Sequence, residues 1–282
     1  MVTVAPYVPT YASRSPYITV AEFKGTPTGV NVDQLNPRAG STTNDDTLKV
    51  MIERASSMAD KYCQQILAAT LETQVGSWRV RSDNTVIVPV PFTPLIQVNQ
   101  FLAGPNASQL TTLTDMSGAW LQRKTVQVPV TGVQADSRGF VKGALQYVAG
   151  FANTVTVGAV TAGAVSFTVD SALGIVPGLQ LTIYDVGFTE RVQVASVTGN
   201  VITVAAPLLY AHATGMSISA LPPAVKQAVI FLTVALLKTR GSEAHVMASM
   251  NTAPSRKTQI QDGGFEEIDL AVELLEDHRR SV

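Results

Sequence analysis

The chain has 282 residues, of which 46% are hydrophobic and 15% are charged, so a disordered chain is excluded. Twenty Lys and Arg against 21 Asp and Glu leave a net charge of −1, which argues against nucleic-acid binding that relies on neutralising phosphates. The single cysteine, Cys63, excludes an intramolecular disulfide, and the first residues lack the basic and apolar regions of a secretory signal. We therefore expect a protein that is made and kept in a cytosol, or assembled there into something larger.

Residues 1–43 are rich in Pro and Gly and show little periodicity, which predicts an extended N-terminal arm with the candidate strand "YITVAEF" at 17–23. A helix follows, capped by Thr43 or Asn44, because apolar residues from Leu48 to Leu67 recur at helical spacing. Its opposite face is polar and charged. We expect this helix to pack on one side only, with Cys63 as a small buried hydrophobe on its apolar stripe.

Two β regions follow the long helix. From about 70 to 151, short β-branched and aromatic runs predict strands, and the prolines at 89, 91 and 94 favour edge or bent strands. Residues 152–220 carry very few charges, and their strands recur every 8 to 12 residues or so, which predicts a small sandwich or barrel. Within this region, Gly199 and Asn200 predict a tight hairpin turn.

The segment Leu221–Ala244 is the most apolar of the chain. Its uncharged block of ten residues lies between Lys226 and Lys238, about half of the roughly 20 residues that a membrane span needs. It predicts a helix that protein encloses, because it is apolar nearly all round. The stripe of Val225, Ala228, Leu232 and Leu236 is expected to pack on the 48–67 helix and the first sheet. The candidates for subunit contact are Ile230, Phe231, Val234 and Leu237.

The C-terminal segment, 246–282, begins without a pattern and ends in "FEEIDLAVELLEDHRR", which predicts a short amphipathic helix. We expect this tethered helix to serve a partner rather than the core of its own chain. Its apolar residues are Phe265, Ile268, Ala271, Val272 and Leu275. The predicted fold class is α+β, with an N-terminal arm (1–43), a helix-and-strand core (44–151), an inserted β domain (152–220), a hydrophobic helix (221–245) and a C-terminal arm (246–282).

No motif in the chain supports catalysis, a metal site or a cofactor site. His212, His245 and His278 have no His, Cys or acidic neighbour at metal-ligand spacing, and we expect them in solvent or turns. The run "GAVTAGAV" lacks the lysine of a phosphate-binding loop, so its glycines are interpreted as turn residues. We predict a protein that is not an enzyme.

Two segments together resemble the head-to-tail connector (adaptor) proteins of tailed bacteriophages. "TLKVMIERASSMADKYCQQILAATLETQ" is similar to the family's first long helix, with its "RAS...D.YC...L..T" pattern, and the strand that follows. "YVAGF" and "LPPAVKQAVIFLTVALLKTRG" resemble its closing strand and next helix. About seventy residues lie between these two, so 152–220 looks like the inserted β domain of connectors from phages of actinobacteria.

The resemblance implies a ring, of twelve copies in this family, beneath the portal in the neck of a virion that is assembled in the host cytoplasm. It implies that the C-terminal arm contacts the portal protein, that the other end receives the next neck or tail-terminator protein, and that genomic DNA passes through the channel without sequence-specific binding. No membrane partner is implied.

Two other functions compete with this one. The first is a virion or tail protein whose β domain binds carbohydrate on the host surface, although its aromatic residues are few (Phe167, Tyr184, Phe188 and Tyr210). The second is a hydrolase whose triad is assembled in space, which the lack of a catalytic motif disfavours.

Overall fold

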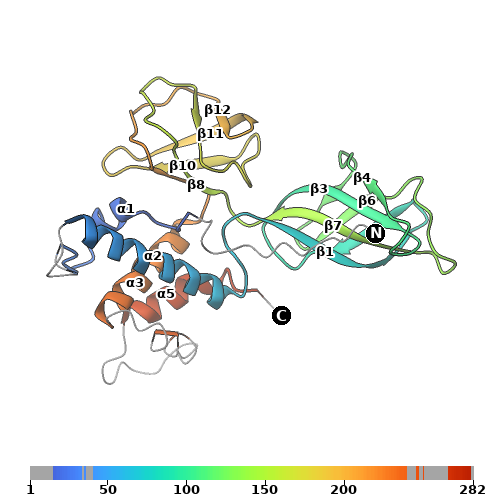
Figure 1. Ribbon diagram of the computed structural model, residues 1–282, viewed down its shortest axis with the longest axis horizontal. Helices are drawn as coiled ribbons and strands as arrows, with labels where there is room; N and C mark the ends of the chain where they lie inside the picture. The colour runs from blue at the N-terminus through green and yellow to red at the C-terminus, as the bar shows by residue number, and fades with distance from the viewer. Residues whose placement is uncertain are drawn as a thin grey trace. The chain divides into compact units, whose positions relative to one another are not determined.

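The computed structural model describes residues 15–33, 35, 41–239, 246–247, 250 and 266–280. The chain forms two compact units, one with the strands of Ala68–Phe151 and one with the elements before Ala68 and after Phe151 (Figure 1). Helices and antiparallel sheets together confirm the α+β class. The boundary after Leu67 lies inside the range 44–151, which was predicted to form one domain. The five-part division stays a prediction.

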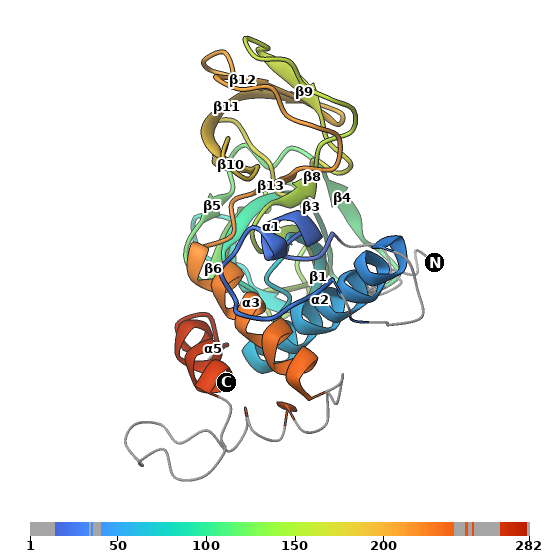
Figure 2. The ribbon, with the colours of Figure 1, turned by 90° about the vertical axis from the view of Figure 1, so that its left-hand side faces the viewer.

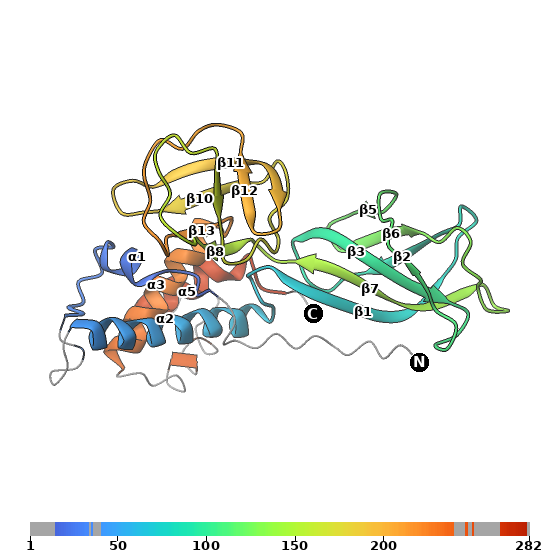
Figure 3. The ribbon, with the colours of Figure 1, turned by 45° about the horizontal axis from the view of Figure 1, so that its top comes forward.

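The first unit consists of two antiparallel sheets with a common core. Because inward-facing residues of both sheets belong to one buried cluster, among them Val88, Phe101, Val128 and Leu145, the sheets pack face to face. Pro89 lies in a strand at the edge of its sheet, as predicted. Figure 3 shows the long strands of this unit side by side. One sheet has the order β1 (Thr70–Arg79), β7 (Phe140–Ala149), β3 (Leu95–Gly104), β4 (Thr111–Leu113), and the other β2 (Thr85–Pro89), β6 (Thr125–Pro129), β5 (Trp120–Leu121).

The inserted segment, 152–220, forms a closed six-stranded barrel. Its two edge strands pair with each other just beyond their ends, through Val157 N–H to Thr168 O (2.9 Å) and Asp170 N–H to Val155 O (3.0 Å). Every edge is therefore used, and a barrel rather than a sandwich results (Figure 2). The strand order is β8 (Asn153–Val155), β13 (Ser217–Ser219), β10 (Gln180–Tyr184), β11 (Glu190–Thr198), β12 (Val201–Val204), β9 (Ser166–Thr168).

The barrel encloses an apolar core and begins and ends at one place. Ile183, Ile202 and Ile218 alternate with outward residues on three of its strands and are fully buried. Gly199 opens the β11–β12 turn with φ 56°, which confirms the predicted hairpin. Ala220 N–H donates to Ala152 O over 2.8 Å, so the chain enters and leaves the barrel at neighbouring positions.

Helix α2 (Ser41–Cys63) ends earlier than predicted. The apolar pattern continues to Leu67, but Gln64 takes a left-handed conformation with φ 54°. Gln65 N–H then donates to Asp60 O and Gln64 N–H to Lys61 O, the two hydrogen bonds of a Schellman motif. The expected continuation through Leu67 is therefore wrong.

The candidate strand at 17–23 is also wrong, because residues Val20–Lys24 form the short helix α1. Thr19 caps this helix: its side chain accepts from Glu22 N–H, and the Glu22 carboxylate accepts from Thr19 N–H (2.6 Å). This reciprocal capping box makes the helix more favourable than an extended segment.

Helix α3 (Pro223–Lys238) is the predicted apolar helix, and α5 (Glu266–Glu276) is the predicted amphipathic one. Figures 1 and 2 show α2, α3 and α5 side by side, and α3 contacts both of the others. The stripe of α3 that was expected to pack on the long helix is fully buried, namely Val225, Ala228, Leu232 and Leu236.

Candidate functional site

The four predicted subunit-contact residues of α3 differ in their accessibility. Ile230 and Val234 are 8% and 3% exposed in the single chain, whereas Phe231 and Leu237 are half-buried. The first two side chains are thus largely covered by their own chain. A subunit contact through any of the four, like the packing of α3 on the first sheet, stays a prediction.

The predicted portal-docking helix α5 lies against its own chain. Ile268, Ala271 and Leu275 are buried, and Val272 is half-buried, where α5 contacts α3 and α2. Phe265 lies outside the described residues. In the single chain α5 thus covers part of α3, which is apolar nearly all round, and docking of this helix on the portal stays a prediction.

The last residue of α5 and the segment after it are also attached to the end of α2. Tyr62 Oη donates to Glu276 Oε2 over 2.5 Å, and burial together with this carboxylate raises the pKa of Tyr62 to about 12. Arg280 N–H donates to Cys63 O over 2.9 Å. Burial, with the nearby carboxylates of Asp60 and Glu276, raises the pKa of Cys63 to about 12 as well, so this thiol is a buried hydrophobe and not a nucleophile.

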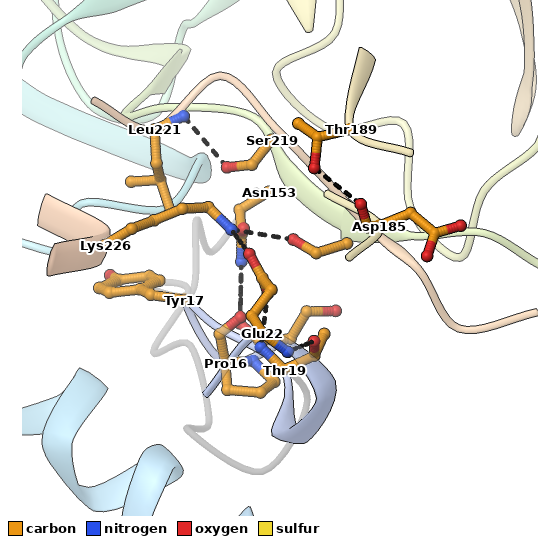
Figure 4. Close-up of polar contacts among 12 residues, drawn as sticks. Pro16, Tyr17, Thr19, Glu22, Asn153, Asp185, Thr189, Ser219, Leu221 and Lys226 are labelled. Atoms are coloured by element: carbon orange, nitrogen blue, oxygen red, sulfur yellow. Dashed lines mark hydrogen bonds and ion pairs between the residues drawn. The ribbon is translucent and has the colours of Figure 1, made fainter. Parts of the chain in front are cut away.

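Lys226 of α3 is the centre of a buried joint between the helices and the barrel (Figure 4). Its ammonium donates to Glu22 of α1 (2.6 Å) and to Ser217 Oγ of β13 (3.1 Å). The same nitrogen lies 3.7 Å from the centre of the Tyr184 ring, a cation–π contact. Burial lowers the pKa of Lys226, and the carboxylate of Glu22 opposes this by favouring the charged form.

The N-terminal segment carries two further anchors of this joint. Asn153 Nδ2 donates to the carbonyls of Ser15 and Pro16, each over 3.1 Å (Figure 4). Tyr17 is buried, its N–H donates to Ser56 Oγ of α2 (3.1 Å), and its hydroxyl is hydrogen-bonded to Asp60. Residues 15–24 therefore connect α2, α3 and the barrel.

A pocket of about 330 Å³ opens at this joint, between α1, α3 and the β10–β11 loop. Its lining includes Glu22 and Lys226, which are paired with each other, and apolar side chains such as Ile18, Val186 and Ile230. These two charges hold α1 and α3 together. No group of His, Cys, Asp and Glu in the described part of the chain could hold a metal ion.

A second buried polar cluster lies in the inserted segment, 152–220, at the β10–β11 loop, and was missed by sequence reasoning. His212 is fully buried, with Nδ1 3.0 Å from Asp185 Oδ2 and Nε2 2.8 Å from Glu190 Oε1. Glu190 also accepts from the backbone N–H groups of Leu209 and Tyr210. The expectation of a solvent or turn histidine is therefore wrong, because His212 connects the β10–β11 loop to the segment before β13.

The other two histidines lie in the C-terminal part of the chain. His278 is partly buried, which lowers its pKa, and its carbonyl accepts from Gln65 Nε2. His245 lies outside the described residues. Among the described helices, none is both long enough and apolar enough to span a bilayer.

Comparisons with known proteins give weak likenesses only. No family model matches the chain, and no curated protein matches it. One similar chain belongs to the virion of a native gene transfer agent (GTA) particle; its sequence identity is 14% and the TM-score is 0.42. Another belongs to the neck of an empty GTA particle computed with C6 symmetry; its identity is 15% and the TM-score is 0.40. Each likeness covers 94% of this chain and 91% of the other. Scores of this size assign neither a fold nor a function to this chain.

Proposed function

We propose that this chain is a structural head-to-tail connector subunit of a phage neck. One observation supports this most. The two segments that resemble connector proteins, 47–74 and 221–241, include most of α2 and all of α3, and these helices pack on each other. The strands of the first unit and the barrel lie between them in the sequence, and the barrel begins and ends at hydrogen-bonded residues, Ala152 and Ala220. Two segments that resemble connector proteins at separate places in the sequence thus lie in contact.

In this proposal the subunits form a closed ring of twelve beneath the portal and continue the DNA channel from capsid to tail. A near-neutral chain suits DNA that must slide past without being held. The C-terminal arm contacts the portal protein, and the opposite end of the ring receives the next neck or tail-terminator protein. The chain has no catalytic role in this arrangement.

The test is the assembly state of the purified protein, alone and mixed with portal protein. We expect closed rings, visible by negative-stain electron microscopy, with a mass by light scattering that corresponds to about twelve copies. A protein that stays monomeric with portal present would overturn the proposal.

The alternative, carbohydrate binding on a virion or tail, is supported by one aromatic pair. Phe188 and Tyr210 are 51% and 40% exposed and their ring centres are 5.5 Å apart. In contrast, Phe167 is buried and Tyr184 lies under the ammonium of Lys226, so neither ring is free to stack on a sugar. A glycan array probed with the full chain and with Phe188→Ala tests this alternative, which needs binding that the substitution removes.

A further inference from the structure

The outer face of the three-stranded sheet carries an exposed tryptophan. Trp120 of β5 is 64% exposed, whereas Trp78, the only other tryptophan of the chain, is 8% exposed in the core of the same unit. An indole contributes more to binding than most side chains when a ligand covers it, because it has a large apolar surface and one polar N–H group. The side chains around Trp120 then decide which ligand this face can bind.

Strand register gives Trp120 its neighbours. It lies opposite Gln127 of β6, and Gln127 lies opposite Ile87 of β2, so the three residues form one row across the sheet. The row faces outward, because Val126 and Val128, the neighbours of Gln127 along β6, belong to the buried core. Within these three strands, all of which the structure describes, no outward side chain is charged. The same face also carries Thr85, Pro89, Thr125 and Pro129.

Two carboxamides beside the indole are held in place by hydrogen bonds. Gln127 Nε2 donates to Thr85 Oγ1 (3.1 Å), and this hydroxyl donates to Asp83 Oδ1 (2.7 Å). Gln122, two residues after the tryptophan, accepts at Oε1 from Thr125 Oγ1 (2.9 Å). These bonds leave the oxygen of Gln127 as an acceptor and the NH₂ group of Gln122 as a donor. The face therefore presents both kinds of hydrogen-bonding group next to an apolar ring.

The surface around the indole is small and open. Gly118, two residues before Trp120, has no side chain, and a Cβ at this position would lie 3.1 Å from Cγ of Pro129. The strands β2, β6 and β5 have five, five and two residues. At about 3.4 Å per residue and about 4.8 Å between strands they cover roughly 200 Å², against about 800 Å² for each partner of a stable protein complex. The face by itself therefore suits a small ligand better than a second copy of the chain.

We infer that Trp120, Gln127 and Gln122 form a binding site for a neutral saccharide ring. The C–H groups on one side of a pyranose pack on the electron-rich face of an indole, and its hydroxyls both donate and accept hydrogen bonds, as the two carboxamides require. A phosphate or carboxylate would meet no cation on the outward face, because Arg123 and Lys124 lie in the turn between β5 and β6. Since the face is flat rather than concave, we expect dissociation constants in the millimolar range.

This site is separate from the functions considered above. It lies in the first unit, whereas the aromatic pair Phe188 and Tyr210 belongs to the barrel. The inference does not depend on a ring or on a phage neck, so its failure would leave the proposed function untouched.

The two indole N–H signals in NMR spectra of the full-length chain test the inference. The probes are the methyl glycosides of D-glucose, D-galactose and N-acetyl-D-glucosamine, each added to tens of millimolar. We expect the Trp120 signal to shift with at least one glycoside until it saturates, while the signal of buried Trp78 stays in place. No shift of Trp120 with any of the three would overturn the inference. Shifts of equal size at both signals would reflect the change of solvent and would overturn it as well.

Matched glutamine variants test the role of the carboxamide. Gln127→Leu removes one hydrogen-bonding group beside the indole and should weaken glycoside binding about fivefold. Gln97 is an exposed glutamine of β3, in the other sheet of the same unit, and Gln97→Leu should leave binding unchanged. The Trp78 signal reports whether each variant keeps its fold. Equal effects of the two substitutions would contradict the assigned site.

Saturation transfer from protein to glycoside identifies the unit that binds. We expect Trp120→Ala to abolish the transfer and Phe188→Ala to keep it. The reverse result would assign saccharide binding to the barrel and overturn the inference.

Two further outcomes would assign the face to another occupant and overturn the inference. A Trp120 signal that moves with protein concentration, without any glycoside, would mean that a second copy covers the indole. A larger shift with a short single-stranded DNA than with any glycoside, lost at high salt, would mean that the indole stacks on bases.

Discussion

Lys226 and Glu22 form a buried ion pair whose two members come from opposite ends of the chain. Their side chains are 5% and 11% exposed. Removal of one partner of such a pair leaves the other charge buried and unpaired, which costs about 3–5 kcal/mol. We therefore expect Glu22→Gln to destabilise the unit that contains α3, measured by urea unfolding followed by circular dichroism.

Two further variants make this result specific. In Glu22→Gln/Lys226→Met no unpaired ammonium remains, so much of the lost stability should return. The surface pair Lys24–Asp45 is partly exposed, and Lys24→Gln should cost less than about 1 kcal/mol. Equal losses for Glu22→Gln and Lys24→Gln would refute the importance of the buried pair.

Glu190 should make the barrel sensitive to acid. Burial raises the pKa of this carboxyl, but the hydrogen bonds from Leu209, Tyr210 and His212 outweigh burial and lower the pKa below its usual 4.5. A carboxyl with a lowered pKa contributes stability that is complete above the pKa of the unfolded chain and is lost as the pH falls through the lowered value.

The amides that bond to Glu190 report this loss directly. We expect the NMR signals of Leu209 and Tyr210 to shift as the pH falls below about 4.5, the range in which the carboxylate takes up its proton. Glu190→Gln should abolish this shift in the same range. If the substituted and the unsubstituted chain titrate alike, another group is responsible.

The two buried polar clusters show which residues sequence reasoning misplaces. Lys226 was interpreted as a charge flanking an apolar block, because its partner Glu22 lies 204 residues away and no local pattern connects them. His212 lies 22 and 27 residues from its two carboxylates, on other strands or loops. Pairs of this kind depend on tertiary topology, which spacing along the chain does not reveal.

At the scale of elements, α5 is predicted to stabilise the helical core. Leu275 is fully buried, and truncation of a buried leucine to alanine costs about 2–5 kcal/mol through lost contacts and a cavity. Leu270 on the same helix is 38% exposed, so Leu270→Ala should cost much less. Denaturant unfolding of Leu275→Ala and Leu270→Ala measures the difference, and similar values would show that α5 leaves the core in solution.

Periodicity predicted the elements better than their ends. The apolar stripes of α2, α3 and α5 and the turn at Gly199 followed from spacing alone, because side-chain burial imposes that spacing. The end of α2 was missed, since the left-handed conformation of Gln64 interrupts a continuing apolar pattern. The capping box of Thr19 and Glu22 was present in the sequence and would have predicted α1. Closure of the barrel depends on the pairing of distant edges and had no local signal.

At the scale of the whole molecule, a substitution at Phe231 is predicted to affect assembly without affecting folding. It is half-buried in the single chain, whereas Val234 is almost fully covered. We expect Phe231→Asp to abolish the proposed ring and leave a folded monomer, because the charge stays near the surface. Val234→Asp should unfold the helical core instead, since it buries an unpaired charge.

Size-exclusion chromatography with light scattering and circular dichroism distinguishes these two results. A folded Phe231→Asp variant that still forms rings would remove this side chain from the subunit interface. Rings formed by Val234→Asp would in addition contradict the burial of this residue.

The hydrogen bond between Ala220 and Ala152 has a consequence for how such a chain can change over evolutionary time. Because the chain leaves the barrel beside the point where it enters, a gene could gain, lose or exchange this segment while the spacing of the flanking residues stays the same. Such an exchange would change the residues that contact Lys226. A new module must replace the hydrogen bond of Lys226 to Ser217 and its cation–π contact with Tyr184, or the buried ammonium loses these two contacts.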